Sequence, residues 1–185
     1  IAKEQGEFGA TDVYSALACK LVDRHPHVFG DVEAADAEES LSVWDKQKMK
    51  EHKIKNVAEN VIDVPRFMST LMRCQKVQSR AAKGGYEFSD VSQILAKVRE
   101  ETEEFLQADQ ADKQMEGGDL LFAVVNLLRS LGVDSETALM MSTEKFTNRV
   151  VECERLLAER GQKLTDLNMQ QFDELWAEVK KNANR

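Results

Sequence analysis

Residues 97–128 read KVREETEEFLQADQADKQMEGGDLLFAVVNLL, and this stretch decides the fold. Its first part places apolar and acidic residues at helical spacing, and its last part is almost uninterrupted apolar sequence. The acidic segment between the two parts is short, so we predict two helices that pack antiparallel. The first is predicted to be capped by Ser89 or Asp90 and to run to about Ala108. The second is predicted over about 113–131, at the centre of a bundle.

The rest of the chain also carries helical signals. Apolar residues follow helical spacing, prolines number two, and no stretch alternates apolar and polar residues for long. We therefore predict an all-α fold. Further helices are expected from Thr11 or Asp12 to Pro26, over about 33–55, from Pro65 to Gly84, from Asp134 or Ser135 to Gly161, and after the Asn168–Gln171 capping box.

Composition narrows the class of protein. The chain has 185 residues, of which 42% are hydrophobic and 31% charged, which is typical of a folded globular protein. A net charge of -8 argues against binding a nucleic acid polymer. No apolar run approaches the ~20 residues of a membrane span. The three cysteines are far apart and lack zinc spacing, so we expect reduced thiols and a cytoplasmic protein.

Two acidic motifs lie on the two central helices. Glu101 and Glu104 are three residues apart, which places them about 60° apart around a helix. Glu116 and Asp119 repeat this spacing, and an antiparallel hairpin would bring the four carboxylates together. Each motif alone has a plainer interpretation, because glutamate-rich helices are usually solvated and Asp119 could cap a helix.

Asn126 favours a site over these plainer interpretations. It follows Asp119 by seven residues, so a polar stripe runs along an otherwise apolar helix. Such a stripe is unfavourable unless its polar groups are satisfied, and converging carboxylates repel one another. A divalent cation resolves both problems, and oxygen ligands select Mg²⁺, with Mn²⁺ possible. We therefore predict a metal site for phosphate chemistry.

A basic and aromatic pattern occurs twice. Both copies consist of two basic residues at i,i+4, followed later by a tryptophan and a lysine at i,i+4. The copies are Lys20, Arg24, Trp44 and Lys48, and Lys145, Arg149, Trp176 and Lys180. Coincidence among common residues is the alternative to a repeat. As a repeat, the pattern predicts the back half of a first unit with its acidic motif missing, plus linker (1–55), and a complete unit (56–185).

These motifs resemble the MazG family of all-α nucleoside triphosphate pyrophosphohydrolases. The resemblance spans nearly the whole chain. It is carried by RHPHVFGD at 24–31, the acidic motifs at 97–104 and 116–119, LLF at 120–122, Val125-Asn126-Leu127, Lys145-Phe146, Arg149, Trp176 and Lys180. The chain departs at Met115 and Gly117, where the family often has a glutamate and an apolar residue.

The resemblance implies an activity and roles for these residues. Family members hydrolyse nucleoside triphosphates to the monophosphate and pyrophosphate with Mg²⁺, and dimerisation completes their helical bundle. Longer members carry two units, so the chain is expected to start within the first. The implied metal ligands are Glu101, Glu104, Glu116 and Asp119, with Glu100 nearby to orient water. The implied substrate contacts are Lys97, Asn126, Lys145, Arg149, Lys180 and Trp176.

Several interpretations stay open at this point. The basic residues could form a solvated face, and Trp176 could belong to the core. If Trp176 stacks on the base, broad specificity follows, because stacking tolerates every base. The alternatives are an enzyme for one non-canonical nucleotide, or a non-catalytic helical module that senses nucleotides.

Overall fold

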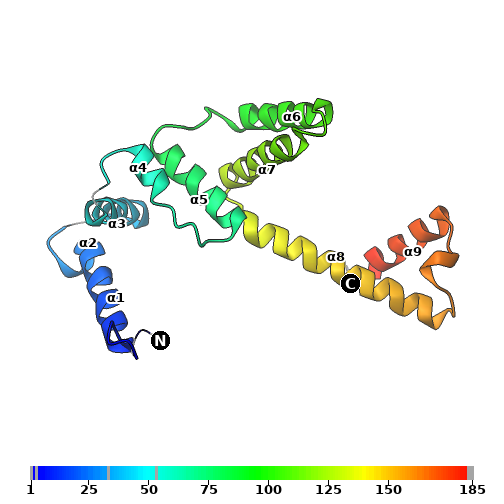
Figure 1. The fold of residues 1–185 in the computed structure, drawn as a ribbon, viewed down its shortest axis with the longest axis horizontal. Helices are drawn as coiled ribbons and strands as arrows, with labels where there is room; N and C mark the ends of the chain where they lie inside the picture. Colours follow the sequence, from blue (N-terminus) through cyan, green and yellow to red (C-terminus); the bar gives the residue numbers. More distant parts are fainter. Residues whose placement is uncertain (1, 3, 33, 53, 183–185) are drawn as a thin grey trace. The chain divides into compact units, whose positions relative to one another are not determined.

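The computed structural model describes residues 2, 4–32, 34–52 and 54–182. These residues form helices and contain no strand, which confirms the all-α prediction. None of the helices among them combines the length and apolar character that crossing a membrane requires. The chain divides into two compact units, Ile1–Val64 (unit 1) and Pro65–Arg185 (unit 2) (Figure 1). The predicted equivalence of 1–55 and 56–185 as related units stays a prediction.

Unit 1 differs from the prediction in its second half. Its helices are α1 (Ala10–Arg24), α2 (Pro26–Phe29), α3 (Ala37–Glu51) and α4 (Val57–Ile62). One helix, α3, lies within the predicted range of about 33–55, but it is shorter at both ends, and α4 after it was not predicted. Asn56 begins α4 by accepting a hydrogen bond from the backbone N–H of Glu59 at 2.9 Å. Residues 33 and 53 lie outside the described part of the chain.

Unit 2 follows the predicted helices closely. It contains α5 (Thr70–Lys83), α6 (Val91–Gln107), α7 (Lys113–Ser130), α8 (Ser135–Glu159), a short 3₁₀ helix (Leu164–Asp166) and α9 (Met169–Asn182). Asp90 caps α6 and Asp134 caps α8. Asn168 and Gln171 exchange hydrogen bonds across the start of α9, which confirms the capping box. Local capping chemistry therefore determines where these helices begin.

The start of α5 is the exception in unit 2. The sequence places Pro65 in the first turn of this helix, but α5 begins at Thr70. Glu136 of α8 accepts hydrogen bonds from the Ser69 hydroxyl at 2.6 Å and from the Met72 backbone N–H at 3.3 Å. A carboxylate from α8 thus satisfies a free N–H group at the start of α5. This tertiary contact moves the boundary that local sequence suggested.

Packing in unit 2 has two centres. Helices α6 and α7 lie side by side, α5 packs against α7, and α9 folds back onto α8 (Figure 1). Cys153, Leu156, Leu157, Leu175 and Val179 form the apolar cluster between α8 and α9. On α7, Ala123 and Val125 are buried, whereas Leu121 and Phe122 are 62% and 49% exposed. Residues 120–128 therefore bury one face against α5 and α6 and leave another open.

The α8–α9 cluster should contribute strongly to stability. Leu157 is 2% exposed at its centre. We expect Leu157→Ala to lower the free energy of unfolding by about 2–5 kcal/mol, because the substitution leaves a cavity. Urea denaturation of the full chain measures this change. Leu164→Ala, at an exposed leucine between the same helices, should change it by less than ~0.5 kcal/mol. Equal effects of the two substitutions would contradict this assignment of the core.

Candidate metal centre

Three of the predicted ligands converge between α6 and α7. One carboxylate oxygen each of Glu101, Glu116 and Asp119 lies within 4.8 Å of the others. Glu101 is buried at 7% exposure, Glu116 is half-buried and Asp119 is exposed. Two of these acids come from consecutive turns at the start of α7, and the third comes from the second half of α6. Three of the four predicted carboxylates therefore lie together, and their role as metal ligands stays a prediction.

The turn between α6 and α7 brings these acids together. Asp109 accepts hydrogen bonds from the backbone N–H groups of Ala111 and Asp112, which closes the loop. Lys113 then donates its ammonium to the carbonyls of Phe105 and Leu106 at the end of α6. Because a helix leaves its last carbonyls without partners, this lysine ties the start of α7 to the end of α6.

Gly117 lies where α7 contacts α6. A Cβ atom on Gly117 would lie 3.4 Å from the ring of Phe105, so α7 packs closely on α6 at this residue. Gly117 directly follows Glu116 and lies two residues before Asp119. The close approach therefore falls in the turn of α7 that carries two of the three acids.

Lys97 offsets part of the negative charge. Its ammonium lies 2.6 Å from a carboxylate oxygen of Glu101 and 2.8 Å from one of Glu100. The hydrogen bonds with Glu100 and Glu101 raise the pKa of Lys97, so the lysine stays protonated. The contact to Glu101 matters most, because a buried carboxylate needs a partner.

Glu104 stands apart from the other three predicted ligands. It lies one turn beyond Glu101 on α6, is exposed, and is not part of the group whose oxygens lie within 4.8 Å. Loss of hydration, followed by the negative charge of Glu101, raises the pKa of the Glu104 carboxyl. The two side chains are therefore neighbours, and the role of Glu104 as a fourth ligand stays a prediction. The role of Glu100 likewise stays a prediction.

A small pocket of about 160 Å³ adjoins the carboxylates. Glu101 and Asp119 line it together with two predicted substrate contacts, Lys97 and Asn126. The remaining lining residues are apolar: Phe88, Ile94, Phe122 and Ala123. The pocket thus joins a charged region to an apolar one, which suits a ligand with a charged and an uncharged part.

The other predicted substrate contacts gather elsewhere in unit 2. Lys145 and Arg149 of α8 line a different pocket of about 480 Å³, which Val179 and Asn182 of α9 also line. The Arg149 Nε is buried and has no hydrogen-bond partner within the part of the chain that the structure describes. This pocket shares no lining residue with the one beside the carboxylates.

Trp176 has packing partners of its own. Its ring centroid lies 5.7 Å from that of Phe146 and 6.1 Å from that of Phe172, and the residue packs against the apolar cluster. Lys180 is exposed at the next turn of α9. The structure therefore gives Trp176 the core contacts that the sequence left open, whereas its contact with a base stays a prediction.

The first copy of the basic and aromatic pattern also comes together, in unit 1. The Arg24 guanidinium lies 5.2 Å from the centre of the Trp44 ring, and the Lys48 ammonium lies 5.7 Å from it. Arg24 is paired with Glu51 at 2.6 Å. In both copies the basic pair and the tryptophan lie on two helices that pack together.

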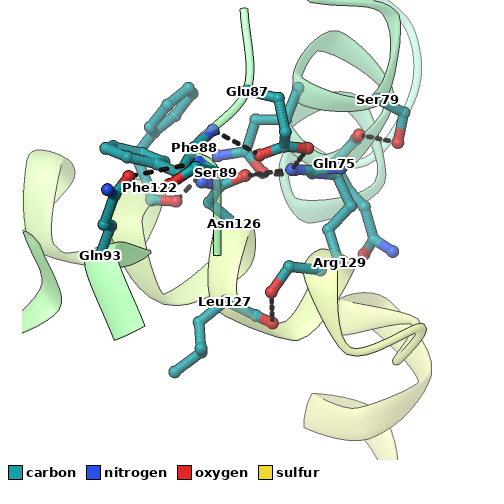
Figure 2. Close-up of polar contacts among 12 residues, drawn as sticks. Gln75, Ser79, Glu87, Phe88, Ser89, Gln93, Phe122, Asn126, Leu127 and Arg129 are labelled. Carbon is teal, nitrogen blue, oxygen red and sulfur yellow. Dashed lines mark hydrogen bonds and ion pairs between the residues drawn. The ribbon is translucent and has the colours of Figure 1, made fainter. Parts of the chain in front are cut away.

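Sequence reasoning missed the neighbours of Asn126. Arg129 donates two hydrogen bonds to its side-chain oxygen and also forms an ion pair with Glu87 (Figure 2). The i,i+3 spacing of Asn126 and Arg129 was a usable signal for the first contact. Nothing in the sequence indicated Glu87, which is 42 residues from Arg129 in the chain.

Comparison with known proteins places the chain in a family. No protein-family model matches it. It is 39% identical over 187 residues to the nucleoside triphosphate pyrophosphohydrolase of Escherichia coli K12, covering 98% of this chain and 71% of the relative. It is 35% identical over 181 residues to the nucleoside triphosphate pyrophosphohydrolase/pyrophosphatase MazG of Thermotoga maritima, covering 97% and 69%. It is also 36% identical over 192 residues to the uncharacterized protein YabN of Bacillus subtilis, covering 100% and 39%.

Two of these relatives carry the same named activity, and each aligns with this chain over most of both sequences. The similarity agrees with the motifs quoted from 24–31, 97–104 and 116–126. The chain therefore belongs to the MazG family of nucleoside triphosphate pyrophosphohydrolases.

Proposed function

We propose that the chain hydrolyses nucleoside triphosphates between the α and β phosphorus atoms, giving the monophosphate and pyrophosphate. The observation that carries this proposal is the convergence of Glu101, Glu116 and Asp119 within 4.8 Å. The names of the relatives from E. coli and T. maritima point to the same reaction. A carboxylate cluster beside a pocket that is part charged and part apolar suits a metal-bound triphosphate with its nucleoside.

The acids fit a hard divalent cation, and we propose Mg²⁺. Oxygens that share one Mg²⁺ at about 2.1 Å lie at most about 4.2 Å apart, so small rotations of these three side chains suffice to close them around the ion. Glu104 is the proposed fourth ligand, one turn from Glu101. When bound, Mg²⁺ neutralises charge on the phosphate oxygens and favours attack by water.

The residues of the chain itself supply the rest of the proposed reaction. A water oxygen forms a bond to the α phosphorus while the bond from that phosphorus to the bridging oxygen of the β phosphate breaks. Glu100, which is exposed beside Lys97, accepts the proton of the water. Lys97 offsets the charge of both the carboxylates and the phosphates.

We further propose that the protein acts as a homodimer. Lys145 and Arg149 line a pocket separate from the carboxylates, so phosphates held by Glu101 and Asp119 would meet these bases only from a second copy. Both α7 and α8 expose apolar side chains that a second copy could cover: Leu121, Phe122, Leu139, Met140 and Phe146. Stacking of Trp176 or another aromatic ring on the base would leave base specificity broad.

The products of the reaction test the proposed function directly. Incubation of the full chain with each common nucleoside triphosphate and Mg²⁺ should release the monophosphate and pyrophosphate, at rates within about tenfold across bases, because stacking discriminates weakly. Ion-exchange chromatography separates these products. Nucleoside diphosphate with phosphate would contradict the proposed bond cleavage. Turnover of a single non-canonical nucleotide would replace broad specificity with the narrow alternative, and binding without turnover would favour the sensing module.

The metal ligands can be tested on the same two helices. Glu101→Gln and Asp119→Asn should each lower turnover by more than about 100-fold, since even residues that support metal ligands contribute about 10–100-fold. Isothermal titration with Mn²⁺ should show weaker binding in both variants. Glu103→Gln, at an exposed glutamate on the same helix, is the matched control and should leave both quantities unchanged. Glu104→Gln tests the fourth ligand, and unchanged Mn²⁺ affinity there would remove it from the site.

Mixing two inactive variants tests whether subunits share the site. Asp119→Asn removes a ligand beside α6, and Lys145→Ala removes a base on α8. If each site combines α7 of one copy with α8 of the other, mixed dimers contain one intact site, and activity should return after the two variants are mixed and exchanged. Light scattering should give a dimer for both proteins. A monomer, or no recovery in verified mixed dimers, would refute a shared site.

A further inference from the structure

A charged network lies at the end of the pocket farthest along α7 from the acids. The Nε and Nη2 atoms of Arg129 donate to the Asn126 Oδ1 at 3.0 and 2.9 Å. Nη2 also pairs with Glu87, which lies in the segment before α6 (Figure 2). The second oxygen of Glu87 accepts the backbone N–H of Phe88 at 3.1 Å. The Arg129 side chain is 14% exposed, so solvent screens its two hydrogen bonds to Asn126 only weakly.

This network determines which end of the Asn126 carboxamide faces the pocket. Arginine is a pure donor, so the group it contacts on Asn126 must be the oxygen. Two donors from one planar guanidinium fix that oxygen more firmly than a single contact would. Asn126 lines the pocket, and within the described residues its amide nitrogen donates to no other group. A hydrogen-bond donor of fixed orientation is therefore available to a ligand there.

The position of Asn126 indicates which part of a substrate it contacts. It follows Asp119 by seven residues, which is about 10 Å along the helix axis. Its neighbours in the pocket include Phe88, Phe122 and Ala123, which are apolar. Lys97 is the only cation in that lining, and it is paired with Glu100 and Glu101. Since Glu87 balances the charge of Arg129, this end of the pocket suits an uncharged group.

We propose that Arg129, supported by Glu87, is a positioning residue that orients the Asn126 amide to donate to an acceptor oxygen on the nucleoside part of the substrate. The inference rests on the proposed function, because it places the phosphates at the carboxylates. Arg129 acts through Asn126 and makes no contact with the substrate. The acceptor is a carbonyl of the base or a hydroxyl of the sugar, which present the same chemistry to an N–H donor.

Binding measurements separate this role from a structural one. Titration of the full chain with an α,β-methylene nucleoside triphosphate and Mg²⁺ avoids turnover, and tripolyphosphate serves as a ligand without a nucleoside. Arg129→Met should weaken binding of the nucleotide analogue roughly tenfold, the loss expected for one hydrogen bond. Affinities for tripolyphosphate and Mn²⁺ should not change. Equal weakening for tripolyphosphate, or no weakening for the nucleotide, would overturn the proposal.

A double-mutant cycle tests whether Arg129 acts through Asn126. Asn126→Ala should weaken binding of the nucleotide analogue as much as Arg129→Met does. The double variant should show no further loss of affinity. Additive losses would mean that Arg129 acts independently of Asn126.

A 2′-deoxy analogue identifies the acceptor. With this analogue, Arg129→Met should no longer weaken binding if the acceptor is the 2′ hydroxyl, and should still weaken it if the acceptor is another oxygen of the nucleoside.

Two further variants distinguish an effect on nucleotide binding from an effect on folding. Arg129→Lys retains the charge opposite Glu87 but not the pair of planar donors, so it should also weaken nucleotide binding while preserving the thermal midpoint. This variant decides the question if Arg129→Met fails to fold. Arg160→Met is the matched control, because it removes another arginine–glutamate ion pair, which joins the C-terminal cap of α8 to Glu178 of α9. It should leave the affinities for the nucleotide analogue, tripolyphosphate and Mn²⁺ unchanged.

These binding measurements involve no turnover. The proposed role of Arg129 can therefore fail while the protein still releases pyrophosphate, and the proposed hydrolysis can fail while Arg129 still affects binding.

Discussion

Mutual repulsion of the carboxylates between α6 and α7 is the constraint on which the arrangement of unit 2 depends. Three acids with oxygens within 4.8 Å of one another disfavour the packing that brings them together. The hairpin is held against this repulsion at the end that carries the loop. Lys113 ties the end of α6 to the start of α7, and α7 contacts Phe105 of α6 at Gly117. The Lys97 ammonium offsets the charge of the buried carboxylate of Glu101.

The surrounding helices fix α7 through side-chain amides rather than through apolar packing alone. Gln78 of α5 donates to the carbonyl of Phe122 at 2.8 Å. Gln75 donates to the carbonyl of Val133 and accepts from the N–H of Ser135, so it holds the turn between α7 and α8 (Figure 2 includes Gln75). These directional hydrogen bonds hold α7 at one position on α5. Asn126, the substrate contact predicted on α7, therefore lies on a helix that is held against α5.

The arginines of the two copies of the basic and aromatic pattern differ in their contacts. In unit 1, Arg24 is engaged by Glu51 and by the Trp44 ring. In unit 2, the Nε of Arg149 is buried and has no partner within the described residues, beside a pocket that Lys145 also lines. A buried donor without a partner is costly in a fold and is common where a ligand completes the site. The second copy is thus the better candidate for binding phosphate.

The sequence by itself determined the all-α class, the α6–α7 hairpin and the approach of Glu101 to Glu116 and Asp119. These follow from signals within a few residues: caps at Asp90 and Asp134, and acids at i,i+3. Only the tertiary structure decided the start of α5, where Glu136 supplies acceptors from 67 residues away. It alone brought Glu87 to Arg129 and placed Phe146 of α8 beside Trp176. Such contacts depend on how helices pack, and a spacing rule within one helix carries no information about the side chain that a second helix presents.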